Sequence, residues 1–224
     1  MLPTINEEQG VGKTIEAIDK GQFKKNKWDL EIIIVDGDSK DKTQKIAKSK
    51  GAKVIVEKRK GYGRAYKTGM PQATGDIIVT GDADATYPFE RIHIYIKKLL
   101  DGNLDFITTD RFAELGHNSM STKHYFGNLI LAITLRLLYF IRLRDSQSGM
   151  WIFKKEALKH IKPLEEFNDG MPFSEEIKIE MFKSKKVKAI EIPSALYARE
   201  GKVKIESFTD GWKNFKFLVL NRVK

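Results

Sequence analysis

The sequence contains no cysteine among its 224 residues. This absence excludes a disulfide framework, a thiolate zinc site, a redox CxxC pair and a cysteine nucleophile. Histidine is also scarce, and no two of the four histidines have the spacing of a metal-binding pair: His93, His117, His124 and His160. We therefore expect neither a zinc site nor a histidine-based hydrolase.

Long apolar runs are missing as well. No stretch of about 18 uncharged apolar residues occurs, so we predict no transmembrane span. The first residues, MLPTINEEQG, have neither the basic start nor the apolar core of a signal peptide. We therefore expect the protein to be intracellular.

Basic residues exceed acidic ones, with 40 Lys and Arg against 30 Asp and Glu, giving a net charge of +10. This excess favours anionic partners such as phosphates, nucleic acid or an anionic membrane surface. A solvated lysine-rich surface explains the charge equally well. A chain of this length fits one large α/β domain that buries roughly 70% of its unfolded surface.

The first half of the chain alternates short apolar runs with amphipathic stretches, which predicts parallel strands joined by helices in a doubly wound, mostly parallel α/β sheet. The expected strands are 31–35, 53–57, 76–80 and, more weakly, 105–109. Ligands of such sheets bind beyond the carboxyl ends of the strands. Polar residues gather at those ends and predict a cation site: Asn6, Glu7, Asp36, Asp38, Asp82, Asp84, Asp110 and Arg111.

The second half is less regular. Residues 128–141 are strongly apolar but contain Arg136, so they form either a buried helix or a helix in the membrane interface, at even odds. Residues 178–182 and 187–192 predict a helix and then a strand. The tail 212–224 mixes aromatic, apolar and basic residues, which is typical of an interfacial amphipathic segment.

Two glycine-containing motifs resemble nucleotide-binding loops. The sequence GVGKT at 10–14 resembles the end of a P-loop, but Glu7 stands where the pattern requires glycine, so we reject an ATPase. The sequence GYG at 61–63 lacks the rest of a dinucleotide fingerprint, so we do not expect a dehydrogenase. This turn is either a plain surface turn or a backbone cradle for a phosphate.

The segment TGDADATYP at 80–88 is the most informative. Asp82 and Asp84 follow a buried strand, and a proline marks the start of the next helix. Two carboxylates in this position suit Mg²⁺ or Mn²⁺, which take few protein ligands and complete their coordination with substrate phosphates.

Together these motifs resemble the family 2 glycosyltransferases of the GT-A fold, and in particular the polyprenyl-phosphate (dolichyl-phosphate) hexose synthases. The resemblance covers nearly the whole chain and rests on the order and spacing of many short motifs: PTINE at 3–7, VD at 35–36, KGYGRA at 60–65, DAD at 82–84, YP at 87–88, RF at 111–112, GN at 127–128, DSQSG at 145–149, and Tyr197, Arg199, Gly201, Lys204, Asp210 and Gly211.

The resemblance implies a nucleotide-sugar donor site and a Mg²⁺ or Mn²⁺ ion. Asp82 and Asp84 would hold the metal. The implied nucleotide-binding residues are Pro3, Asn6, Glu7, Asp36, Asp38, Gly61, Gly63, Asp82 and Ala83. Because relatives have two adjacent Asp residues where this chain has Asp36-Gly37-Asp38, either carboxylate could face the base.

The implied acceptor is a polyprenyl (dolichyl) phosphate, whose phosphate is largely a dianion at neutral pH and needs no general base. The implied catalytic residues are Asp84, Arg111 and Asp145, in an inverting displacement. The implied phosphate ligands are Arg111, Ser148, Arg199 and Lys204. Departures from relatives are Thr86, Trp151, Val203 and the early Met1; the sugar and the choice of UDP or GDP stay open.

The resulting hypothesis is a single GT-A catalytic domain over 1–224. Residues 1–112 would bind the nucleotide sugar, and residues 113–224 would bind the acceptor and contact the membrane. We expect a peripheral enzyme on the cytoplasmic face of the membrane, with no nucleic acid partner. The alternatives are a family 2 transferase with a non-lipid acceptor, a basic nucleic-acid-binding module and a non-catalytic sugar-nucleotide sensor.

Overall fold

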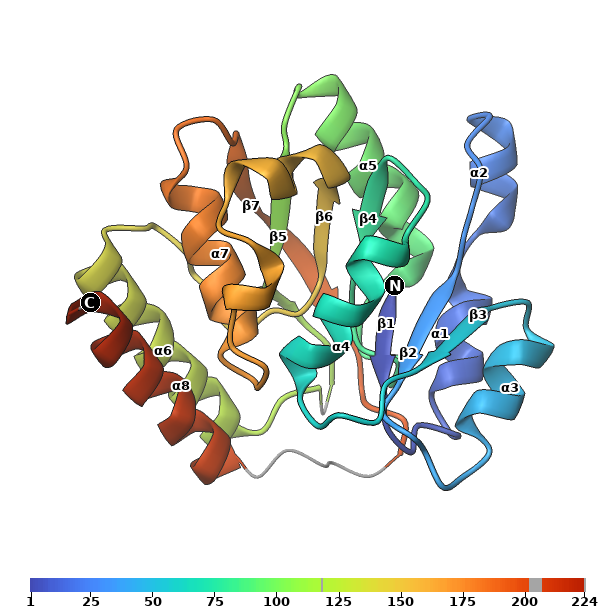
Figure 1. Cartoon of the computed structure of the whole chain (residues 1–224), viewed down its shortest axis with the longest axis horizontal. Coiled ribbons are helices and arrows are strands. Elements are labelled where there is room, and N and C mark those ends of the chain that lie inside the picture. Colours follow the sequence, from blue (N-terminus) through green and yellow to red (C-terminus); the bar gives the residue numbers. More distant parts are fainter. Residues whose placement is uncertain (118, 202–206, 224) are drawn as a thin grey trace.

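A computed structural model describes residues 1–117, 119–201 and 207–223 (Figure 1). Its strands are β1 (Leu2–Thr4), β2 (Ile33–Asp36), β3 (Lys53–Val56), β4 (Ile77–Val79), β5 (Phe106–Leu115), β6 (Trp151–Lys154) and β7 (Ala189–Leu196). Its α-helices are α1 (Val11–Ala17), α2 (Lys20–Lys25), α3 (Thr43–Ser49), α4 (Tyr62–Gly69), α5 (Ile92–Asp101), α6 (Thr122–Tyr139), α7 (Phe173–Lys183) and α8 (Ser207–Val223). Short 3₁₀ turns are η1 (Met70–Gln72), η2 (Phe89–Arg91), η3 (Lys155–His160) and η4 (Leu164–Glu166).

The strands form two sheets. One is parallel, in the order β1-β2-β3, and the other has the order β4-β6-β5-β7. The amino group of Met1 donates to the carbonyl oxygen of Val79 at 2.7 Å, which joins β1 to β4. Strand β6 is antiparallel to both of its neighbours, whereas β5 and β7 are parallel. The sequence analysis missed β6, a four-residue strand that begins two positions after Gly149.

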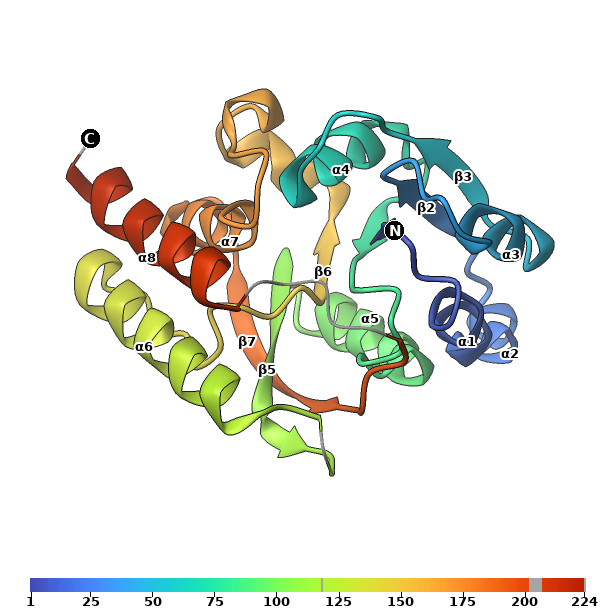
Figure 2. The same ribbon diagram turned by 90° about the horizontal axis from the view of Figure 1, so that it is seen from below.

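Helices cover both faces of the strands, as a doubly wound sheet requires. In β2, Ile34 packs toward α1 and α5, whereas Ile33 and Val35 pack toward α4 and α7. Figure 2 shows α4 and α7 on one side of the strands and α1 and α5 on the other. The unbroken apolar run at 31–35 follows from this burial on two faces. The predicted fold class is therefore confirmed, with β6 as its antiparallel element.

Helices α6 and α8 lie side by side at the edge of the molecule (Figures 1 and 2). Leu131, Leu135 and Tyr139 of α6 form a separate apolar cluster with Leu218 of α8 and Ile179 of α7. The opposite side of α6 is exposed, with Leu137 at 70%, and so is Phe140 directly after the helix, at 82%. The apolar run at 128–141 is thus buried on one side only.

The antiparallel direction of β6 brings residues 145–149 to the edge where β4 ends. Thr80 donates its N–H to the carbonyl oxygen of Trp151 at 2.9 Å and its hydroxyl to that of Gly149 at 2.8 Å. Arg111 lies within β5 rather than after it, because this strand continues to Leu115 beyond a register shift. The predicted division at 112 also falls inside β5. Among the described helices, none is long and apolar enough to cross a bilayer.

Candidate active site

The Asp82-Ala83-Asp84 turn follows β4 and is held rigidly. Asp84 is buried, and its Oδ1 accepts hydrogen bonds from the Thr86 hydroxyl at 2.6 Å and from the Thr86 N–H at 3.2 Å. Ala85 has a positive φ of 63°, and its N–H donates to Thr14 Oγ1 at 3.0 Å. These contacts fix the backbone that carries both carboxylates.

The start of α1 packs directly on this turn. A Cβ at Gly10 would lie 2.6 Å from both the Ala83 carbonyl oxygen and the Asp84 Cα, so only glycine allows this approach. Thr14 donates its hydroxyl to the Gly10 carbonyl oxygen at 3.0 Å while it accepts from the turn. The GVGKT sequence therefore supports the carboxylate turn, which gives it a packing role in place of a P-loop.

An arginine from the far end of the chain joins two of the predicted acidic residues. Arg199 contacts Asp84 Oδ2 through Nη1 at 2.6 Å and Glu7 Oε1 through Nη2 at 2.7 Å. Backbone bonds hold the same segment to the turn, since Glu200 N–H donates to the Asp84 carbonyl oxygen at 2.9 Å. The structure thus brings together one residue from each of three implied roles: Glu7 for the nucleotide, Asp84 for the metal and Arg199 for the acceptor phosphate.

The pKa of the Asp82 carboxyl is strongly raised. Burial, followed by the nearby Asp84 carboxylate, raises the pKa of Asp82 to about 7, although Arg111 and Arg199 act in the opposite direction. In the part of the chain that the structure describes, no group of three or more His, Asp or Glu residues forms a complete metal cage. Two carboxylates instead fit a cation that takes its other oxygens from a substrate diphosphate.

The two carboxylates at the end of β2, Asp36 in its last position and Asp38 beyond it, have different environments. Asp36 is fully buried and accepts from the Thr4 hydroxyl at 2.8 Å, the Gln44 amide at 2.7 Å and the Ser39 hydroxyl and N–H. Asp38 is half-exposed, has a positive φ of 62° and pairs with Lys40 at 2.5 Å. Asp36 therefore organises the loop, and Asp38 is the more exposed carboxylate; the contact of either with a nucleotide stays a prediction.

The PTINE loop is tied to this second loop through its backbone. Pro3 lies in β1 opposite Val35. Asn6, with a positive φ of 51°, donates its N–H to Ser39 Oγ at 2.7 Å and accepts from the Lys40 N–H at 2.8 Å. The predicted base-binding residues therefore share one edge of the sheet.

The GYG turn lies apart from these loops. A Cβ at Gly61 would be 2.1 Å from the Asp169 carbonyl oxygen, and one at Gly63 would be 2.2 Å from that of Asn168. The N–H of Gly63 donates to the Gly170 carbonyl oxygen at 3.2 Å. Both glycines thus allow α4 to pack on the 168–170 loop, and their predicted contact with nucleotide stays a prediction. Gly61 also lines a cavity of about 780 Å³ between this loop and α8.

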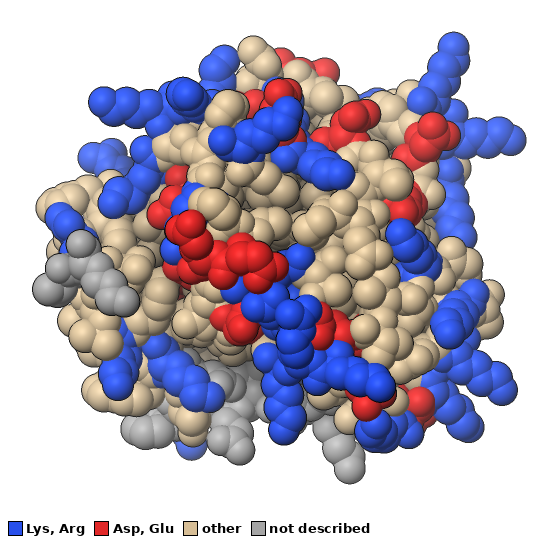
Figure 3. Space-filling model, viewed as in Figure 1, with Lys and Arg blue, Asp and Glu red and all other residues tan. Residues whose placement is uncertain are grey.

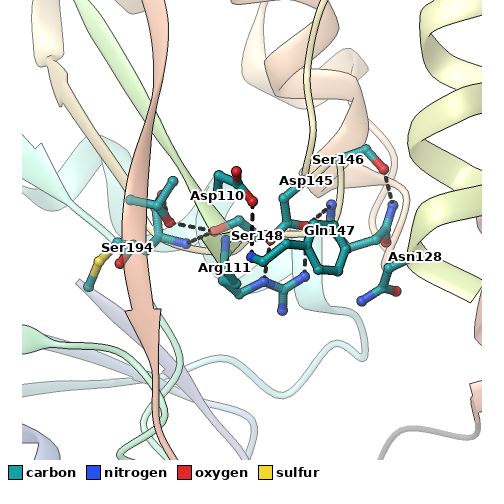
Figure 4. Close-up of polar contacts among 12 residues, drawn as sticks. Asp110, Arg111, Asn128, Asp145, Ser146, Gln147, Ser148 and Ser194 are labelled. Atoms are coloured by element: carbon teal, nitrogen blue, oxygen red, sulfur yellow. Dashed lines mark hydrogen bonds and ion pairs between the residues drawn. The ribbon is translucent and has the colours of Figure 1, made fainter. Parts of the chain in front are cut away.

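A second charged centre joins β5 to the DSQSG segment (Figure 4). Arg111 donates from Nε to Asp145 Oδ2 at 2.6 Å and from Nη2 to Asp145 Oδ1 at 2.9 Å. The backbone N–H of Arg111 also donates to Asp145 Oδ2, at 3.1 Å, and adds a third hydrogen bond to this fork. Asp145 is fully buried, yet the charge and hydrogen bonds of Arg111 keep its pKa below the usual value against the effect of burial.

The remaining predicted acceptor ligands are placed less favourably. Ser148 is fully buried and its hydroxyl lies 2.7 Å from that of Thr109, so a phosphate does not reach it in this arrangement. Lys204 lies outside the described residues. The prediction for both residues stays a prediction.

Sequence reasoning missed two buried charges on α7. Glu175 and Lys178 are both fully buried; burial raises the pKa of Glu175 to about 8 and lowers that of Lys178 to about 7. Lys178 donates to the Ser146 carbonyl oxygen at 2.5 Å, and Glu175 accepts from the Gln147 side-chain amide. Nothing in the sequence SEEIKIE distinguishes these residues from a solvated helix face, because only the tertiary packing buries them.

The glycosyl transferase family 2 model matches residues 1–162, and the chain belongs to this family. It is 33% identical to the low-salt glycan biosynthesis hexosyltransferase Agl6 of Haloferax volcanii over 99% of this chain and 52% of that protein. It is 29% identical to the dolichyl-phosphate hexose transferase of the same organism, over 94% and 87%. The chain thus spans about half the length of the first relative.

A further sequence relative and a solved structure agree with this assignment. The human dolichyl-phosphate beta-glucosyltransferase is 27% identical in sequence over 70% of this chain and 54% of that protein. Glucosyl-3-phosphoglycerate synthase from Mycobacterium tuberculosis, crystallised with Mn²⁺, UDP-glucose and phosphoglyceric acid, superposes with a TM-score of 0.76. It shares 19% identity, and the match covers 99% of this chain and 77% of that one.

Proposed function

We propose that this enzyme transfers a hexose from a nucleotide sugar to a polyprenyl phosphate at a membrane surface. The observation that carries the proposal is the buried fork between Arg111 and Asp145 beside the Asp82–Asp84 turn. Arg111, an always-charged side chain that would bind the phosphate, thus lies near two carboxylates that would bind a cation. Relatives named as dolichyl-phosphate hexose transferases support the choice of acceptor.

The donor would lie along the edge formed by the PTINE loop, Asp38 and the carboxylate turn. Asp82 and Asp84 would hold Mg²⁺ or Mn²⁺ against the diphosphate, where the ion supplies charge neutralisation for the leaving nucleotide. The Mn²⁺ and UDP-glucose found in the structural relative support this arrangement. Arg199, already in contact with Asp84 and Glu7, adds a second cation at the same position.

The acceptor phosphate would be held by Arg111 and Arg199. A phosphate monoester is mostly a dianion at neutral pH, so it can attack the anomeric carbon without a general base. The bond from carbon to the leaving diphosphate breaks as the new bond to the phosphate oxygen forms, which inverts the anomeric centre. Asp145 would keep the Arg111 guanidinium in line for this attack.

A membrane-facing surface would bring the lipid to this site. The outer side of α6 exposes Phe126, Ile130, Ile133 and Leu137, which recur at the spacing of one helix face, and Phe140 is exposed directly after the helix ends. Figure 3 shows mainly tan and blue side chains over α6 and α8, whereas acidic ones gather near the middle of that view. An apolar helix face with basic neighbours suits the interface of an anionic bilayer. We place the enzyme at the cytoplasmic face as a peripheral protein.

The test is a transfer assay with a panel of radiolabelled UDP- and GDP-sugars, Mg²⁺ or Mn²⁺, and a polyprenyl phosphate in vesicles. We expect one donor to label the lipid, and chelation of the metal to abolish the label. Label that appears only on a soluble acceptor would contradict the lipid acceptor while leaving the transferase class intact. Label that persists after chelation would contradict the metal site.

A further inference from the structure

Helix α8 is connected to the Arg111–Asp145 fork by a short run of polar contacts. Asn214 is 4% exposed and donates from Nδ2 to Gln147 Oε1 at 2.7 Å. The N–H of Gln147 in turn donates to Asp145 Oδ1 at 3.0 Å. Asp145 accepts the fork from Arg111. Three hydrogen-bonded steps thus lead from the middle of α8 to the proposed phosphate ligand.

The side chain of Gln147 is held in one orientation. Its Nε2 donates to Ser146 Oγ at 3.0 Å and to Glu175 Oε1. Because both amide hydrogens are used on this side, Oε1 is turned toward α8, where Asn214 meets it. A displacement of Asn214 would therefore shift the Gln147 side chain and, through it, the backbone of residues 145–147.

Helices α6 and α8 form a unit with its own apolar contacts. Tyr139 donates its hydroxyl to the Leu218 carbonyl oxygen at 2.8 Å, and Arg222 donates to the Leu138 carbonyl oxygen at 2.7 Å. Their buried residues form a cluster distinct from the two cores that pack on the sheets, and α7 links it to one of them, with Ile179 in this cluster and Phe182 packed against both. A force on the outer face of this pair can therefore shift the pair relative to the sheets.

We propose that Asn214 is a positioning residue that couples the seating of the α6–α8 pair on a lipid bilayer to the geometry of the Arg111–Asp145 fork. Insertion of the exposed apolar face into a bilayer would press α8 against residues 145–147 and order them. Phosphate attack would then be fastest at the membrane, where the acceptor resides. This inference rests on the proposed membrane function.

The test compares two identical substitutions on one helix face. Asn214→Leu removes the donor to Gln147 and preserves bulk. Asn221→Leu is the matched control, because residue 221 lies two turns further along α8 and its side chain contacts Tyr139 of α6. Hydrogen–deuterium exchange of residues 141–150 is measured for each protein, with and without vesicles containing phosphatidylglycerol.

We expect vesicles to slow exchange of this segment about fivefold in the wild type and in Asn221→Leu, the factor that one hydrogen bond of ordinary strength provides. In Asn214→Leu the segment should not respond, although vesicles still protect α6. An equal response in Asn214→Leu and the wild type would overturn the coupling. So would equal losses in both variants, which would indicate general loosening of α8.

Turnover provides the second readout. The ratio of the rate with vesicle-bound polyprenyl phosphate to the rate with a short, water-soluble prenyl phosphate should fall about fivefold in Asn214→Leu and stay constant in Asn221→Leu. The KM for the nucleotide sugar should not change in either. A wild type that binds vesicles and shows the exchange response, yet transfers no sugar to lipid, would retain the coupling and contradict the proposed function. A wild type whose segment ignores vesicles would overturn the coupling alone.

Discussion

The two halves of the chain treat apolar surface and buried charge differently. Among the described residues, four large apolar side chains are exposed in the first 112 residues, and ten are exposed after them. In the first half, the buried Asp36 carboxylate is stabilised by hydrogen bonds from hydroxyl, amide and backbone donors. In the second half, buried Asp145 is paired with an arginine, and Glu175 and Lys178 are buried near it.

This difference fits the donor and acceptor sites that we propose for the two halves. A loop held by neutral donors is rigid before any ligand arrives, which suits a nucleotide of fixed shape. A buried ion pair beside an apolar, exposed helix pair is suited to a phosphate delivered from a lipid surface. The comparison predicts that substitutions in the second half cost stability together with activity, whereas those at the first site cost activity alone.

The largest effect is expected for Arg111→Met. It leaves the Asp145 carboxylate buried without a cation, and breaking such a pair by removing one partner costs about 3–5 kcal/mol. Urea unfolding should show this loss in the free energy of unfolding, and transfer to lipid phosphate should disappear. An unfolding midpoint equal to that of the wild type would contradict the buried ion pair.

Asp84→Asn should lower the rate of sugar transfer roughly 10²–10³-fold, since a metal ligand contributes several kcal/mol of charge stabilisation. Its folding should change little, because the neighbouring Glu7–Arg199 pair remains. Circular dichroism and urea unfolding provide the stability measurement. Activity within a few-fold of the wild type would remove Asp84 from the metal site, and a large loss of stability would break the contrast with Arg111.

The sequence predicted the parallel part of the fold because the relevant signals are local. Runs such as EIIIV at 31–35 and the DAD turn report their strand and its end directly. Strand β6 was missed because its four residues pair only with distant strands, with Ile152 opposite Val79 and Ile107. Local pattern carries little information about such pairing.

The site was predictable to the same extent. Glu7, Asp84 and Arg199 were implied as site residues by the resemblance to family 2 glycosyltransferases, and the structure brings them into contact. The burial of Glu175 and Lys178 was not predictable, since α7 reads as a charged helix until α6, α8 and the 145–148 segment surround it. The role of Gly63 was likewise hidden, because the loop it packs against lies about a hundred positions away in the chain.

Glu175→Gln tests the buried charges of the second half through pH. The folded pKa of Glu175 is about 8, above its ordinary value, so the folded state holds a proton that the unfolded state releases. Stability is therefore full below about pH 4.5 and falls as the pH rises toward 8. Lys178, with its pKa lowered to about 7, acts oppositely above pH 7, where stability rises with pH. Between pH 5 and 7 the wild type should lose about 2 kcal/mol that Glu175→Gln retains.

Urea unfolding at pH 5 and pH 7 measures this difference. Asp38→Asn is a suitable control, because that carboxylate is exposed and already ionised at both pH values, with its pKa lowered by Lys40. Parallel pH profiles for the wild type and Glu175→Gln would mean that Glu175 is ionised in the folded protein. The second half would then resemble the first in how it compensates buried charge.

The smallest effect concerns the exposed apolar surface itself. Leu137 on α6 and Leu100 on α5 are both leucines on helices, exposed by 70% and 44%. Leu137→Ser should weaken binding to anionic vesicles about tenfold, because roughly 1.4 kcal/mol of apolar burial is lost at the bilayer. Leu100→Ser, in the first half, should leave vesicle binding unchanged.

Flotation with vesicles of increasing phosphatidylglycerol content measures both affinities. Neither substitution should move the unfolding midpoint appreciably, since exposed side chains contribute within about 0.5 kcal/mol to stability. Equal weakening by both would mean that the apolar excess of the second half has no specific role at the membrane. Weakening by Leu137→Ser alone would show that the second half exposes apolar side chains to bind a lipid surface. The free energy of unfolding would then be unchanged, and only the affinity for vesicles would fall.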